Sequence, residues 1–80
     1  MVRINVMTFN QGILDTNELY QSFFEDSDNE VIKRAENRFM ELAREINPEI
    51  TDEELSVVLD DGSYDNINGR EVIFSWPEIK

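Results

Sequence analysis

The chain has 80 residues, of which 40% are hydrophobic, and it contains neither cysteine nor histidine. Its 18 acidic and 7 basic residues give a formal net charge of −11 at pH 7. This composition predicts one small globular domain over residues 1–80, because the apolar content is too high for a disordered acidic tail. The lack of Cys and His excludes disulfides, thiolate or imidazole metal sites, and Ser-His or Cys-His catalysis.

The longest apolar runs span only a few residues, and the N-terminus lacks the apolar segment of a signal peptide. We therefore expect no membrane partner and a cytoplasmic location, which the absence of cysteine also suits. The strongly negative charge opposes direct binding to nucleic acid, because like charges repel over about a Debye length. The same field keeps a small protein soluble and steers it toward basic partners.

The N-terminal segment predicts a strand followed by a turn. Apolar side chains alternate in residues 2–9, which places Val2, Ile4 and Val6 on one buried face. The Asn-Gln-Gly sequence at residues 10–12 is a turn signal.

Residues 13–24 allow two interpretations. In the first, they return from the turn as the second strand of a hairpin. In the second, they form a helix in which Asp15 and Glu18 make a capping box and Leu14 and Leu19 a hydrophobic staple. The polar start suits the helix, whereas the preceding glycine turn suits the hairpin. We favour the hairpin, although local propensity favours the helix.

The clearest predicted element is a long helix over residues 28–46. Ser27 and Glu30 have the spacing of a capping box at its start, and Pro48 ends it. Residues at steps of three and four form one apolar stripe: Ile32, Ala35, Phe39, Leu42 and Ile46.

This helix also contains four of the seven basic residues, interleaved with five acidic ones. The spacing predicts the ion pairs Glu30–Arg34 and Glu41–Arg44. We therefore interpret its charges as a solvated, salt-bridged surface and not as a nucleic-acid site.

A second, shorter helix is predicted to begin after Thr51. Thr51 and Glu54 form a capping box, Ile50 and Leu55 form a hydrophobic staple, and Gly62 suits the C-terminal cap.

The C-terminal segment predicts a β-hairpin. Asn68-Gly69 stands between two strand-like runs, residues 63–67 and 70–76, and indicates a type I′ turn. Trp76 is expected to lie in the core, although Trp76, Tyr20 and Tyr64 would add aromatic anchors to a binding surface if exposed. The following proline limits further pairing.

The sequence thus predicts an α+β fold: a small antiparallel sheet of three or four strands packed on one long and one short helix. The sheet combines an N-terminal strand or hairpin with the C-terminal Asn-Gly hairpin.

The chain shows little that would support catalysis or metal binding. Residues 26–30 and 61–65 begin like calcium loops, but both lack the glycine at position six and the glutamate at position twelve. Each glycine stands at a predicted turn or cap, so no phosphate-binding loop is present. We expect neither enzymatic activity, nor a cofactor, nor a specific metal site.

The acidic residues concentrate where no basic residue occurs, in residues 4–32 and 45–69. Aspartates at the C-terminal end of the short helix are disfavoured by the helix dipole, so they indicate another role. The candidate partner-binding residues of the second block are Asp52, Glu53, Glu54, Asp60, Asp61 and Asp65.

In size and composition the chain resembles small acidic inhibitors carried by phages and mobile elements, including DNA mimics and some anti-restriction or anti-CRISPR proteins. The resemblance involves no residue-by-residue motif and transfers no functional position. It implies a non-enzymatic inhibitor or decoy that occupies a basic, nucleic-acid-binding surface of a partner protein. The alternative is an adaptor or assembly protein that binds through an apolar patch, with acidity serving solubility alone. A homodimer is left open.

Overall fold

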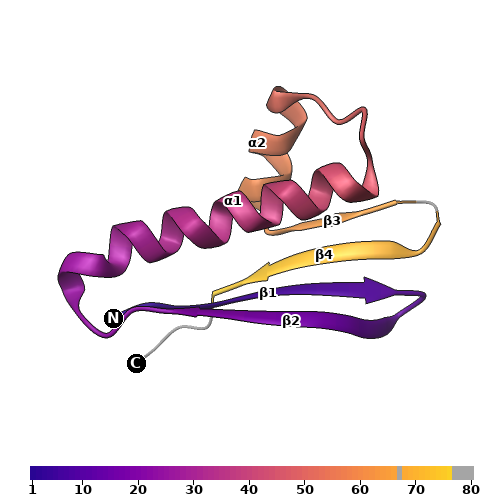
Figure 1. The fold of residues 1–80 in the computed structure, drawn as a ribbon. Helices are drawn as coiled ribbons and strands as arrows, with labels where there is room; N and C mark the ends of the chain where they lie inside the picture. The colour runs from indigo at the N-terminus through magenta and orange to yellow at the C-terminus, as the bar shows by residue number, and fades with distance from the viewer. Residues whose placement is uncertain (67, 77–80) are drawn as a thin grey trace.

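A computed structural model describes residues 1–66 and 68–76 of the protein. The elements in chain order are β1 (Arg3–Asn10), β2 (Ile13–Gln21), the 3-10 turn η1 (Glu25–Ser27), α1 (Asp28–Ile46), α2 (Asp52–Asp61), β3 (Ser63–Asp65) and β4 (Arg70–Ser75). The strands form one antiparallel sheet in the order β2-β1-β4-β3. Both helices lie on one side of it, and α2 projects away from the sheet beside α1 (Figure 1). The predicted α+β class is confirmed.

The core lies between α1 and the two central strands. Ile4 and Val6 of β1 and Val72 of β4 are fully buried beneath the helix, as the alternation in each strand predicts. Phe39 of α1 packs edge-on against Phe74 of β4, with ring centroids 6.0 Å apart. The rest of the helix stripe is buried as predicted, except that the first turn buries Val31 while Ile32 stays partly exposed.

Residues 13–21 form strand β2, so the hairpin interpretation is confirmed and the helical one is wrong. Gln11 (φ 55°) and Gly12 (φ 78°) both have positive φ, as a type I′ turn requires. Asp15 is the extra residue of a β-bulge, because Thr8 pairs with Thr16 while Phe9 pairs with Leu14. Backbone pairing with β1 therefore outweighs the local helix signals of this segment.

The type I′ turn predicted at Asn68-Gly69 is wrong. The N–H of Asn66 donates to the carbonyl of Arg70 (3.0 Å), so the pair that closes the loop is Asn66–Arg70, and the connection is longer than the two residues of a type I′ turn. The loop instead closes through Asn66, whose backbone carbonyl accepts from the N–H of Gly69 (3.1 Å). Its side-chain oxygen accepts from the N–H groups of Asn68 (3.0 Å) and Arg70 (3.2 Å). The hairpin itself is present, with a longer connection.

The strand before this loop is shorter than predicted, because β3 ends at Asp65. Residue 67, expected to end that strand, and Pro77, expected to limit β4, lie outside the described residues. Trp76 is 48% exposed, so its placement in the core is also wrong. Its ring lies edge-on to Phe74, at a centroid distance of 6.5 Å.

The two helices begin differently. The Thr51 hydroxyl accepts from the N–H of Glu54 (3.2 Å), and Gly62 (φ 80°) caps the other end of α2, as predicted. At the start of α1 the Ser27 hydroxyl instead donates to the carbonyl of Phe24 (2.9 Å), so the predicted cap is wrong. Within the described ranges, neither helix is long and apolar enough to cross a membrane.

Candidate functional site

Four carboxylates gather on the exposed side of α2. Leu55 is buried against the core, which turns the opposite side of the helix toward solvent. At 100° per residue, the seven-residue step from Glu53 to Asp60 returns to the same side, about 10 Å along the axis. The same step joins Glu54 and Asp61. We call Glu53, Glu54, Asp60 and Asp61 the α2 acidic face; all four are exposed.

The other two predicted site residues lie apart from this face. Asp52 is also exposed on α2, but its carboxylate pairs with Arg44 of α1 at 3.3 Å. Asp65 lies on β3, where its neighbour Tyr64 packs toward the core. Because successive side chains alternate across a strand, Asp65 points to the opposite side of the sheet. The structure therefore brings together four of the six predicted residues.

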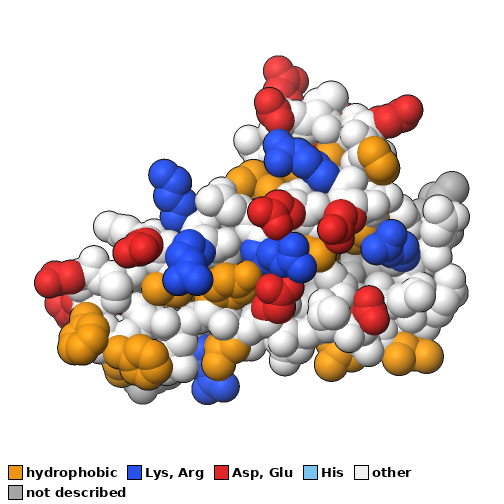
Figure 2. Space-filling model, in the orientation of Figure 1, with side chains coloured by type: hydrophobic (Ala, Val, Ile, Leu, Met, Phe, Trp, Pro, Cys, Tyr) orange, Lys and Arg blue, Asp and Glu red, His pale blue; other side chains and the backbone are white. Residues whose placement is uncertain are grey.

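The α2 acidic face lacks a basic partner within the described part of the chain. There, the side-chain ion pairs join Arg38 to Glu18 (2.9 Å) and Glu41 (3.1 Å), and Arg44 to Asp52. The pairs predicted within α1, Glu30–Arg34 and Glu41–Arg44, do not appear among them. Figure 2 shows basic and acidic side chains interleaved over α1, with acidic ones projecting where α2 lies. The side-chain ion pairs of α1 among the described residues thus involve Arg38 and Arg44, and their partners all lie outside the α2 acidic face.

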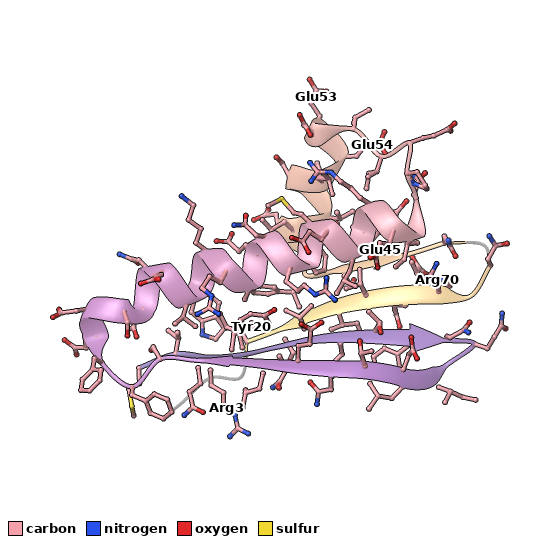
Figure 3. The ribbon with its side chains drawn as sticks, viewed as in Figure 1. Arg3, Tyr20, Glu45, Glu53, Glu54 and Arg70 are labelled. Atoms are coloured by element: carbon pink, nitrogen blue, oxygen red, sulfur yellow. The ribbon has the colours of Figure 1, made fainter. Side chains whose placement is uncertain are left out.

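Two shallow hollows flank α2, and each combines carboxylates with apolar side chains. The first, of about 360 Å³, is lined by Glu53, Glu54, Val57, Val58 and Tyr64. The second, of about 380 Å³, lies where α2 meets α1 and β4, and its lining includes Asp60, Asp61, Phe74 and Trp76. Figure 3 shows Glu53 and Glu54 at the end of α2 farther from the sheet, so the hollows lie toward opposite ends of the helix.

Such hollows match the chemistry of lysine and arginine side chains. These side chains carry an apolar stem, which can lie against apolar surface while the charged head remains at the rim. In the second hollow, Trp76 also offers an aromatic ring to a cation. The arrangement is chemically suited to holding basic groups of another macromolecule.

Two residues of this surface were not predicted from the sequence. Val57 is 62% exposed between the carboxylates of α2, and Trp76 is half exposed at the second hollow. Val57 could have been found, because helical spacing places it on the same side as Glu53 and Asp60. For Trp76 the core was favoured over a role as an aromatic anchor, because its alternation with Phe74 indicates the buried side of β4.

The segments that begin like calcium loops do not fold as loops. Residues 26–30 span η1 and the first turn of α1, and residues 61–65 run from the end of α2 through β3. Nor do the described residues contain a cluster of three or more potential metal ligands of the His, Cys, Asp or Glu type. Comparisons of the chain with protein-family models, curated proteins and solved structures gave no match.

Proposed function

We propose that the protein is a non-enzymatic inhibitor, a DNA-mimic-like decoy that occupies a basic, nucleic-acid-binding surface of a partner protein. The supporting observation is the α2 acidic face, four exposed carboxylates on one side of a helix with no ion-pair partner among the described residues. A cytoplasmic protein of the anti-CRISPR or related anti-defence type, carried by a phage or mobile element, would have this chemistry.

The physical basis is competition for the same cations that bind phosphates. Proteins bind duplex DNA by neutralising its regularly spaced phosphates with Lys and Arg. On α2, carboxylates are held in two groups about 10 Å apart, because a helix fixes their spacing. The hollows beside them accommodate the apolar stems of those basic side chains. Opposite charges also accelerate the encounter of the two proteins, and the acidic surface disfavours binding of the decoy itself to other acidic molecules, duplex DNA among them.

The test neutralises one end of the α2 acidic face. The variant is Asp60→Asn with Asp61→Asn, which leaves the Thr51–Glu54 cap intact. Its matched control is Glu25→Gln with Asp26→Asn, which changes the net charge equally on the exposed turn η1. The partner is first identified by affinity capture from the native host, and its dissociation constant is then measured at low and high salt.

We expect the α2 variant to bind about tenfold more weakly, since about 1.4 kcal/mol of interaction corresponds to that factor. Its affinity should also depend less steeply on salt, while the control keeps the wild-type affinity and slope. Equal affinities for the three proteins, with a flat salt response, would refute the decoy function.

The second candidate function is an adaptor or assembly protein that binds through an apolar patch. It is favoured by Phe23 and Phe24, which are 69% and 74% exposed in the connection between β2 and η1. A neighbouring pair of exposed phenylalanines is a common feature of protein-binding surfaces. Binding through such a patch tolerates salt, so the titration described above separates the two functions.

A further inference from the structure

One side of the sheet is covered by no described element. Both helices lie on the other side, and Figure 3 shows Tyr20 directed toward α1 and Arg3 away from it. Directly paired residues share a side of the sheet, so the strand register identifies the other side chains on the uncovered side. We call this side, which α1 does not cover, the open face.

The open face has an apolar centre that spans the three longest strands. Its apolar residues are Met7 and Phe9 of β1, Leu14 and Leu19 of β2, and Ile73 of β4. Leu14 and Leu19 are about half exposed (51% and 50%), and Figure 2 shows hydrophobic side chains along the lower rim of the molecule, where β2 lies. The remaining side chains near the centre are Asn and Ser. An exposed apolar surface of this kind is typical of a binding site.

Apart from the bulge residue Asp15, which the register assigns to neither side, the charged side chains of the open face within the described strands lie at its two ends. Arg3 lies at one end, beside Gln21. Glu71 and Asp65 lie at the other end. They stand opposite each other on the neighbouring strands β4 and β3, and Glu71 also stands opposite Phe9 of β1. In a chain in which 31% of residues are charged, this uncharged centre between a positive and a negative end is distinctive.

We propose that the open face binds the open face of a second copy of this chain, forming a two-fold symmetric dimer. A two-fold interface brings the same surface of each protomer together, so the surface must complement itself. A two-fold axis parallel to the sheet and perpendicular to its strands reverses the strand direction. It therefore places Arg3 of each protomer near the end of its partner that carries Glu71 and Asp65. Each charged end of the open face therefore meets an end of opposite charge. This complementarity favours a second copy of the chain as the occupant of the open face.

The same axis also brings apolar residues of the two protomers close to each other. If it passes near the pair formed by Met7 and Ile73, each of these residues lies close to its own counterpart in the partner. Leu19 and Leu14 lie on opposite sides of that pair along β2. The rotation therefore brings Leu19 of one protomer close to Leu14 of the other. Two antiparallel sheets packed face to face, with strands rotated by about 30°, are a common arrangement.

The size of the open face determines how strong the dimer should be. The eight residues of β1 extend about 27 Å, and four strands are about 19 Å wide. Two such faces together bury on the order of 1,000 Å², which is at the lower limit for a specific interface. We therefore expect a reversible dimer with a dissociation constant in the micromolar range, about 1–100 μM.

The dimer does not depend on the proposed decoy function and leaves its surface accessible. The α2 acidic face projects on the other side of the sheet, so it stays exposed in both protomers (Figure 1). Two chains of net charge −11 repel each other, and salt reduces this repulsion. Salt should therefore strengthen the dimer, whereas it weakens binding through the α2 acidic face. An experiment can therefore refute the dimer without refuting the decoy function, and the reverse.

The first test measures the mass of the protein in solution by sedimentation from about 1 μM to about 1 mM. Wild type should shift from monomer to dimer over this range, more readily at high salt. Leu19→Lys should remain monomeric with an unchanged melting temperature, because Leu19 is an exposed strand residue. Leu14→Lys is the second variant should the first fail to fold, and Val57→Lys on α2 is the matched control that should still dimerise.

The second test reverses the charges at the two ends. Arg3→Glu and Glu71→Arg should each weaken the dimer about two- to fivefold, the range of an exposed ion pair. The double variant should restore the wild-type dissociation constant. A wild-type protein that is still monomeric at the highest concentration would overturn the proposal. This holds even if a different protein is found to bind the open face. Equal effects of Leu19→Lys and Val57→Lys, or a double variant weaker than both single ones, would also overturn it.

Discussion

Ser22 joins the beginning of the sheet to the beginning of the long helix. It is the only polar side chain among the described residues that is buried, with 2% exposed. Its hydroxyl oxygen accepts a hydrogen bond from the N–H of Val2 (2.9 Å), and the hydroxyl donates to the carboxylate of Asp28. This single side chain therefore satisfies a buried amide and anchors the first residue of α1.

Replacing Ser22 with alanine should lower the free energy of unfolding by about 1–3 kcal/mol, because the buried N–H of Val2 loses its acceptor. The matched control is Ser56→Ala. Its hydroxyl donates to the carbonyl of Asp52 on the exposed side of α2, so its loss should change stability by less than about 0.5 kcal/mol. Urea unfolding at neutral pH measures both. Equal effects of the two substitutions would contradict this account of Ser22.

The same contact makes part of the stability dependent on pH. The hydrogen bond from Ser22 lowers the pKa of Asp28 below its ordinary value in the folded protein. A depressed carboxyl pKa contributes stability above the unfolded pKa, about 3.9, and this contribution is lost as the pH falls through the folded pKa. The stability difference between wild type and Ser22→Ala should therefore narrow below about pH 4. A difference that stays constant down to pH 2 would rule out this linkage.

At the scale of elements, the two helices show that similar sequence signals differ in their structural effect. Both begin with a hydroxyl residue followed three positions later by glutamate. The extended backbone of Thr51 directs its hydroxyl to the amide of Glu54. Ser27 belongs to the preceding 3-10 turn, where its backbone is helical, and its hydroxyl closes that turn on the carbonyl of Phe24. Only the first of these residues caps its helix.

Removing the two hydroxyls should separate these roles. We expect Thr51→Ala to lower the free energy of unfolding by about 1 kcal/mol, the usual cost of losing an N-cap. Ser27→Ala should cost roughly half of that or less, because an exposed turn bond can be replaced by water. Chemical unfolding of both variants tests the comparison. A larger loss from Ser27→Ala would mean that Ser27 does cap α1.

At the scale of the whole molecule, the negative charge is distributed unevenly. Among the basic residues of α1, Arg38 pairs with Glu18 and Glu41, and Arg44 pairs with Asp52. The α2 acidic face projects from the same side of the sheet without such pairing within the described ranges. The open face carries almost no charge at its centre. The structure therefore separates an acidic surface from an apolar one on opposite sides of one sheet.

This distribution predicts how stability responds to salt. Asp60→Asn with Asp61→Asn should raise the melting temperature by about 2 °C at low salt, because it relieves self-repulsion and an unfavourable helix-end placement. The gain should shrink as salt screens these charges. Glu25→Gln with Asp26→Asn is the control and should not stabilise, since acids at a helix start are favourable. A drop in melting temperature of the α2 variant would show that its aspartates support the fold.

The sequence by itself determined several elements through local signals. The stripe of α1 follows from residues at helical spacing, and the cap of α2 follows from Thr51 and Gly62. The buried sides of β1 and β4 follow from alternating apolar residues. Each of these signals depends on contacts within a few residues or on one face of one element. Locality alone was not sufficient, since the hydroxyl of Ser27 closes the preceding 3-10 turn, and Asn66 closes the loop at Asn68-Gly69 in another way.

Only the tertiary structure decided features that depend on distant parts of the chain. Residues 13–21 form a strand because β1 offers a paired backbone, which local propensity does not describe. Arg38 pairs with Glu18 across 20 positions, and not with neighbours on its helix alone, because β2 passes beneath it. Asp65 is separated from the α2 acidic face because α2 and β3 lie on different layers. The open face exists because both helices pack on the same side of the sheet, an arrangement that hydrophobic alternation in single strands cannot specify.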